Sequence, residues 1–154
     1  MTTIGRQDNR LTRFTRLARR YELREGPGVV GECRDLAREA LGDWLGPVDG
    51  AREVLVEDVL LLVSEVVTNA CRHGGRPYEF RLDGSRGRLW VQVSDTSPVP
   101  PRPHGPHVAG RSSGHGLYLL ERLSTRWGTL PRRVGKAVWF EVAITGAAAA
   151  PGRA

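Results

Sequence analysis

Three groups of polar residues have the types and spacing that could bind a nucleotide. Glu65 and Asn69 are four residues apart in SEVVTNACRHGG, so on a helix they share one face. Asp95 ends the apolar alternation of LWVQVSD, and a carboxylate at the end of a strand can accept a hydrogen bond from an exocyclic amine. The GHG sequence at 114–116 opens a further helical pattern, and the free N–H groups of a helix start suit phosphate oxygens.

Each of these signals alone has a simpler structural explanation. Glu65 and Asn69 are typical of a solvated helix face, Asp95 is typical of a turn, and a glycine pair often begins a helix. Their order along one chain favours a shared function over these separate structural explanations. A polar pair on a helix, an acid at a strand end, a long loop and a helix start together describe one nucleotide site.

Other residues that could hold a metal give no consistent site. His104 and His107 lie among prolines with no third ligand nearby in the sequence, so we interpret them as exposed loop histidines. Cys33 and Cys71 fall in helical patterns outside any CxxC motif or Cys/His cluster. This usage argues against a structural metal and against a disulfide framework, and it favours a reducing, cytoplasmic compartment.

Apolar spacings of three and four predict the helices that would carry the polar groups. The first helix is expected over 29–45 and the second over 51–72, ended by Gly74-Gly75. The stretch LYLLERLSTRW after the GHG sequence predicts a third helix.

Alternation of apolar and polar residues predicts the strands. Two runs, at 78–82 and 89–93, predict a hairpin with its turn at 83–87. A last strand is expected over 138–144, and 21–24 is a candidate short strand. This order predicts an α+β fold, a two-layer sandwich with the helices on one face of a mixed, mostly antiparallel sheet.

Composition and length limit the class of protein. The chain has 154 residues, 23 basic and 17 acidic side chains and a net charge of +6, which fits one globular domain. We expect a basic arm over 1–19, the domain over 20–145 and a tail over 146–154. No apolar run approaches a membrane span, so neither secretion nor membrane insertion is expected. The arginines of the arm match no DNA- or RNA-reading motif, which disfavours nucleic-acid binding.

Four motifs together resemble the Bergerat-fold ATPase superfamily, which is shared by gyrase, histidine kinases and mismatch-repair ATPases. The motifs are LVSEVVTNACRHGG, VQVSDTSPVPP, GHGLYLLERLSTRWG and GKAVWFEV, and the resemblance covers about residues 20–144. Within the superfamily, the chain is most similar to the anti-sigma-factor serine/threonine kinases, particularly the actinobacterial forms. The resemblance implies ATP and Mg²⁺ as ligands, with Asn69 on the Mg²⁺, Glu65 as general base and Asp95 on the adenine amino group.

The resemblance also implies a phosphate-binding segment and a set of partners. Gly114, His115, Gly116 and Leu117 would cradle the phosphates, Arg111 would add charge, and 96–113 would form a lid. The expected reaction transfers the γ-phosphate of ATP to a serine or threonine of a STAS-type anti-sigma-factor antagonist, and a sigma factor is the other expected partner. The sequence leaves open whether the chain forms a homodimer.

Two departures from the superfamily pattern support an alternative. The segment after Asp95 reads TSPV where relatives have D-x-G-x-G, and Ala137 stands where relatives often have a Thr or Ser near the adenine. The alternative is a protein with the same fold and partners that sequesters a sigma factor without phosphotransfer.

His73 matches a His-Gly of the family, but we favour a structural role at the C-terminus of its helix.

Overall fold

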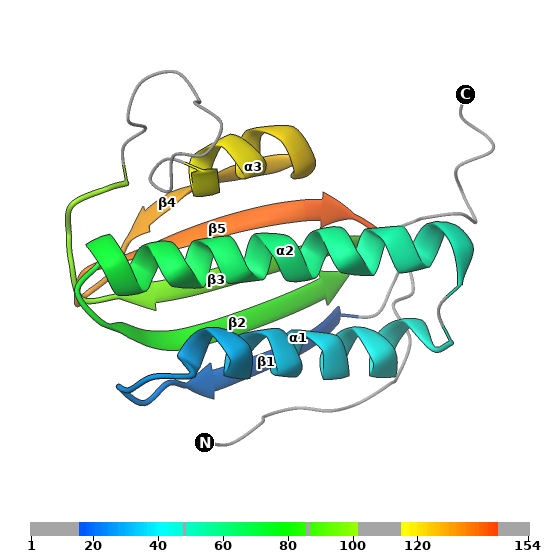
Figure 1. Ribbon diagram of the computed structural model, residues 1–154, viewed down its shortest axis with the longest axis horizontal. Helices are drawn as coiled ribbons and strands as arrows, with labels where there is room; N and C mark the ends of the chain where they lie inside the picture. The colour runs from blue at the N-terminus through cyan, green and yellow to red at the C-terminus, as the bar shows by residue number, and fades with distance from the viewer. Residues whose placement is uncertain (1–15, 48, 86, 102–114, 145–154) are drawn as a thin grey trace.

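The fold is a layer of helices packed on one face of a five-stranded sheet (Figure 1). The computed structural model describes residues 16–47, 49–85, 87–101 and 115–144. Its helices are α1 (Val29–Leu45), α2 (Gly50–His73) and α3 (His115–Leu123). Its strands are β1 (Arg16–Glu22), β2 (Pro77–Ser85), β3 (Arg88–Asp95), β4 (Arg126–Pro131) and β5 (Lys136–Ala143). The two-layer α+β class predicted from the sequence is confirmed.

The strand order is β1-β2-β3-β5-β4, and each neighbouring pair in the described sheet is antiparallel. The central pair, β3 and β5, sets the geometry of the site. Their register places Asp95, the last residue of β3, opposite Lys136, the first residue of β5. Residues opposite each other on antiparallel strands point to the same face, so both side chains belong to the helix-covered side of the sheet.

The core lies between the sheet and the apolar faces of α1 and α2. The bounds of α1 are those predicted, and α2 extends the predicted helix by one residue at each end. The side chains of these two helices that the core buries are Val29, Cys33, Ala37, Ala40, Leu41, Trp44, Val59, Leu60, Leu62, Val63, Val66, Val67 and Ala70. The expected apolar positions of β2, β3 and β5 oppose them, with the exception of Tyr78, which lies outside the core. The long second helix is therefore held rigidly along the sheet.

The first strand begins earlier than the sequence predicted. Residues 16–19 belong to β1 rather than to an arm, and the expected strand at 21–24 is shifted toward the N-terminus. Arg19 hides the period-two pattern because it is a charged residue on the buried face. Its guanidinium donates to Asp43 of α1 at 2.6 Å and lies over the ring of Trp44. Residues 1–15 and 145–154 lie outside the described part of the chain.

The third helix is shorter than predicted, and a strand follows it. The apolar spacing of Leu120, Leu123 and Trp127 continues at three and four, which predicted a helix through Trp127. The helix ends at Leu123, and the Thr125 N–H donates to the Glu141 carbonyl at 2.8 Å, which starts pairing with β5. For this reason the sequence prediction assigned the first two residues of β4 to the helix.

Two strand limits also differ from the prediction. The hairpin turn lies beyond Ser85 rather than at 83–87, because Gly84 pairs with Leu89 inside the β2–β3 ladder. The last strand covers 136–143 instead of 138–144. Both β3 and β5 are therefore longer than predicted, and Lys136 is part of the sheet.

The face of the sheet opposite the helices carries stacked aromatic and ion-paired side chains. The indoles of Trp90 and Trp139 are stacked with their centroids 4.2 Å apart and an interplanar angle of 10°. Glu141 lies beside them and binds Arg88 at 2.8 Å and Arg126 at 3.0 Å. In the part of the chain that the structure describes, no helix combines the length and apolar character that crossing a bilayer would need.

Candidate functional site

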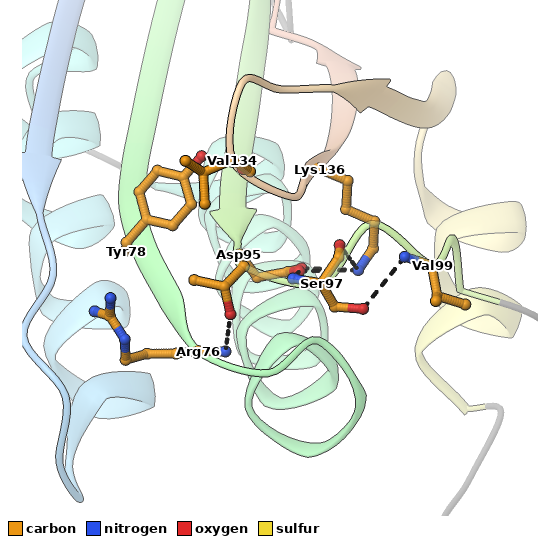
Figure 2. A network of polar contacts seen from close by, with 8 residues as sticks. Arg76, Tyr78, Asp95, Ser97, Val99, Val134 and Lys136 are labelled. Carbon is orange, nitrogen blue, oxygen red and sulfur yellow. Dashed lines mark hydrogen bonds and ion pairs between the residues drawn. The ribbon is translucent and has the colours of Figure 1, made fainter.

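The end of α2 and the end of β3 are fastened together by backbone hydrogen bonds. The Ser97 N–H donates to the carbonyl of Gly74 at 3.0 Å, and the Thr96 N–H donates to the carbonyl of Arg76 at 3.1 Å. The Arg76 N–H in turn donates to the Thr96 hydroxyl at 3.1 Å. The turn after α2 therefore holds the segment after β3 in place, beside the carboxylate of Asp95 (Figure 2).

Asp95 is the most buried of the predicted site residues whose side chains the structure describes. Its side chain is on the helix-covered face, and the residue is 1% exposed. The Oδ1 oxygen accepts the N–H of Ser97 at 2.9 Å, an arrangement typical of an Asx turn. The structure thus places an oriented, buried carboxylate at the strand end where the sequence predicted one.

Lys136 is the counter-ion of Asp95, and the sequence prediction did not include it. Its Nζ lies 2.9 Å from Oδ1 and 3.1 Å from Oδ2, and it donates to the Ser97 carbonyl at 3.2 Å (Figure 2). Lys136 is 5% exposed. One signal could have found it, because it is the only lysine among 23 basic residues and directly precedes the apolar alternation of the last strand.

Two glycines allow the backbone to approach Asp95 closely. A Cβ on Gly74 would lie 2.6 Å from both Cγ and Oδ2 of Asp95. Gly135 has a φ of +70°, and a Cβ there would overlap the main-chain carbonyl of Asp95. A side chain at either position would displace the carboxylate or its strand.

The turn that carries Gly135 and Lys136 is fixed from the opposite side. The Tyr78 hydroxyl donates to the Val134 carbonyl at 2.7 Å, which joins the start of β2 to the β4–β5 turn (Figure 2). Arg132 donates to Ser94 at 3.1 Å and contacts Glu79 at 3.3 Å. The turn that positions the Lys136 ammonium is therefore fastened to both β2 and β3.

Glu65 and Asn69 lie on α2, at the edge of its buried face. Both are partly exposed, and the neighbouring Val66, Val67 and Ala70 are buried. At about 1.5 Å per residue, Asn69 lies roughly 7 Å along the helix axis from Gly74, which contacts Asp95. Glu65 and Asn69 therefore lie on the half of α2 whose C-terminal end adjoins Asp95.

The predicted phosphate-binding residues are only partly described. Arg111 and Gly114 lie outside the described residues, as do the loop histidines His104 and His107. Residues 115–117 form the first turn of α3, in which the side chain of Leu117 is buried in the core. The assignment of these residues to phosphate stays a prediction.

The remaining candidates fit structural roles. His73 is exposed in the last turn of α2, where a basic side chain suits the negative end of the helix dipole. Across the described ranges, no group of three or more His, Cys, Asp or Glu residues could hold a metal ion. Such a cluster is not required for Mg²⁺, which commonly keeps its waters and uses one or two protein ligands.

A comparison with known protein families covers the part of the chain that contains the candidate site. Residues 31–141 match the family model described as a histidine kinase-like ATPase domain. The matched range begins in α1, ends in β5 and contains Glu65, Asn69, Asp95 and Lys136. A search of the curated proteins found no match to this chain.

Proposed function

This chain belongs to the histidine kinase-like ATPase family, and from that membership we propose that it is a protein serine/threonine kinase that uses ATP. Its acceptor is a hydroxyl on a STAS-type anti-sigma-factor antagonist, and its regulatory partner is a sigma factor. The observation that carries the proposal is the junction of α2 and β3. There a buried, oriented carboxylate lies at the end of the helix that also bears Glu65 and Asn69.

Asp95 is the residue suited to the base of the nucleotide. A buried ionised carboxylate only accepts hydrogen bonds, and an exocyclic amine only donates them. Among the described contacts, Oδ2 accepts from Lys136 alone, whereas Oδ1 accepts from both Lys136 and Ser97. The site therefore fits a base that offers an N–H donor, as adenine does.

Asn69 and Glu65 are suited to the phosphate end. The Asn69 side-chain oxygen would hold Mg²⁺, with phosphate oxygens and water completing the coordination. Bound Mg²⁺ would neutralise charge on the phosphates. The free N–H groups at the start of α3 would contact the same oxygens, and Arg111 and Gly114 complete the proposed segment.

Glu65 is the proposed general base of the transfer. It accepts the proton of the acceptor hydroxyl while the bond between the hydroxyl oxygen and the γ-phosphorus forms. The bond from the γ-phosphorus to the β–γ bridging oxygen breaks in the same step, and ADP leaves. Partial exposure of Glu65 is consistent with this role because the acceptor protein must reach it.

One observation favours a second candidate function. Lys136 and the Ser97 N–H already occupy most of the acceptor positions of the Asp95 carboxylate. The second candidate is a protein that sequesters a sigma factor stoichiometrically, without phosphotransfer.

Calorimetric titration with Mg-ATP is the first test. We expect micromolar binding by the full chain and its loss in Asn69→Ala and Asp95→Ala. Folded wild-type protein that takes up no ATP would contradict the proposal and favour the second candidate.

Transfer of radiolabelled γ-phosphate to a candidate antagonist tests the chemistry. Glu65→Gln should retain ATP binding and reduce transfer by about 10²-fold or more. Glu57→Gln is the matched control, because Glu57 is exposed two turns earlier on the same helix. Equal transfer by the two variants would show that Glu65 is not the base.

A further inference from the structure

The ammonium of Lys136 has no donor left for a ligand. A lysine ammonium carries three N–H donors. In the structure they match three acceptors, which are Oδ1 and Oδ2 of Asp95 and the carbonyl oxygen of Ser97. Since the side chain is also 7% exposed, Lys136 acts on the site only through the groups that it already binds.

The carboxylate of Asp95 retains one acceptor position. Each carboxylate oxygen can accept about two hydrogen bonds. Oδ1 accepts from Lys136 and from the Ser97 N–H, and both contacts are 2.9 Å. Within the described residues, Oδ2 accepts only from Lys136, at 3.1 Å. One acceptor position of the carboxylate, on Oδ2, therefore has no hydrogen bond from the described residues.

We propose that Lys136 is a positioning residue for the nucleobase, which fixes the Asp95 carboxylate so that Oδ2 receives one N–H of a purine 6-amino group. This inference rests on the proposed function, since it concerns the base of the same nucleotide. On this proposal, the Lys136–Asp95 pair, rather than Asp95 alone, distinguishes purines that carry the amino group from purines that lack it.

Lys136 stays bound to Asp95 when the base is present. A purine amino group is neutral, so it cannot replace the positive charge that balances a carboxylate in a buried position. Separating a buried ion pair leaves an uncompensated charge, which is strongly unfavourable. The turn that carries Lys136 is also fixed by Gly135 and by the Tyr78 hydroxyl, which limits the retreat of the ammonium.

A binding cycle tests this assignment. Wild-type protein and Lys136→Met are titrated with Mg-ATP and with purine riboside triphosphate, which lacks the 6-amino group. Methionine keeps nearly the length of lysine and removes all three donors. We expect the variant to lose about tenfold in ATP affinity, equivalent to one hydrogen bond, and to bind the amine-free nucleotide as the wild type does.

Two outcomes of the cycle would overturn the inference. An equal loss for both nucleotides would show a general structural role, and tighter ATP binding would show that Lys136 competes with the base. If Lys136→Met does not fold, the double variant Lys136→Met with Asp95→Asn removes both charges at similar volume. It should prefer ATP less than the wild type does, because the neutral amide is a weaker acceptor that Lys136 no longer fixes, and an unchanged preference for ATP would contradict the proposal.

A spectroscopic measurement follows the ammonium directly. Because Lys136 is the only lysine, protein labelled with ¹³Cε-lysine gives one side-chain NMR signal. With ATP the signal should shift but keep the character of a buried, ion-paired lysine, and movement to the position of a solvent-exposed lysine would overturn the proposal. Failure of wild-type protein to bind ATP would contradict both proposals, whereas ATP binding with an unaffected variant would contradict this one alone.

Discussion

Asp95 and Gly74 show how closely a carboxylate can approach the backbone at the end of a helix. A methyl group on Gly74 would lie 2.6 Å from the carboxylate and 2.8 Å from the Ala70 carbonyl oxygen. That oxygen accepts the N–H of Gly74 at the C-terminal end of α2. The carboxylate is held by Lys136 and Ser97, and the other neighbour is a backbone atom, so neither can move aside easily. The residue at 74 therefore determines where the carboxylate sits.

Gly74→Ala should lower the free energy of unfolding by about 1–3 kcal/mol and weaken ATP binding, because the added carbon displaces Asp95. The matched control is Gly42→Ala in α1, where an added Cβ meets nothing within 4 Å. That change should raise stability by about 0.5–1 kcal/mol. Urea unfolding and ATP titration measure both effects, and equal behaviour of the two variants would contradict the role of Gly74.

The sequence allowed part of this site to be predicted. Asp95 could be predicted because a local pattern, an apolar strand ending in an acid, marks it. The pairing of Asp95 with Lys136 could not, because this contact spans 41 residues and depends on the exact register of β3 and β5. Helical spacing placed Glu65 and Asn69 on one face of α2, whereas their position relative to Asp95 depends on the packing of α2 on the sheet.

Three neighbouring strands are tied together by one acidic side chain. Glu141 of β5 accepts from Arg88 of β3 and from Arg126 of β4, and its side chain is 8% exposed. Burial by itself would raise the pKa of Glu141. The hydrogen bonds and charges of Arg126 and Arg88 outweigh burial and hold the pKa below its usual value.

Glu141→Gln should therefore destabilise the chain most at neutral pH, by about 1 kcal/mol, since both arginines are largely exposed. A carboxylate with a lowered pKa stabilises the fold above its ordinary pKa, here 4.5, and loses that contribution as the pH falls through the folded value. Urea unfolding at neutral pH and at about pH 3 measures the difference. The control is Glu39→Gln, at an exposed position of α1, and a difference that persists in acid would contradict this account.

The elements that matched the prediction share one property. In α1 and α2, long apolar stripes at helical spacing define the element without reference to the rest of the chain. β1 and β4 did not match, because the core-facing position of Arg19 and the helix-like spacing before Trp127 mask their alternation. Both are edge strands of the described sheet, where local signals are weakest.

The whole domain folds around a core that buries one of its two cysteines. Cys33 is 0% exposed, and burial, with the charges of Glu32 and Cys71, raises the pKa of its thiol to about 12. Cys71 is exposed on α2, and partial burial raises its pKa to a lesser extent. The two thiols therefore differ in what limits their reaction, since Cys71 reacts from the surface and Cys33 requires opening of the core.

A disulfide reagent should modify one thiol quickly in the native chain and both thiols in denaturant. The rate at Cys71 should rise with pH because the thiolate reacts, and Cys33 should react slower by roughly 10³-fold or more, as the core must open first. Cys71→Ser should remove the fast phase. Comparable rates at the two positions would show that α1 is loosely packed.

The stacked indoles of Trp90 and Trp139 give the protein an optical label of its own. Two such rings 4.2 Å apart couple electronically, so their near-ultraviolet circular dichroism depends on the geometry of β3 against β5. The pair lies on the face of the sheet away from the helices and from Asp95. A small molecule bound beside Asp95 should leave that signal nearly unchanged, whereas a protein laid across the open face should alter it, so one spectrum separates the two modes of binding.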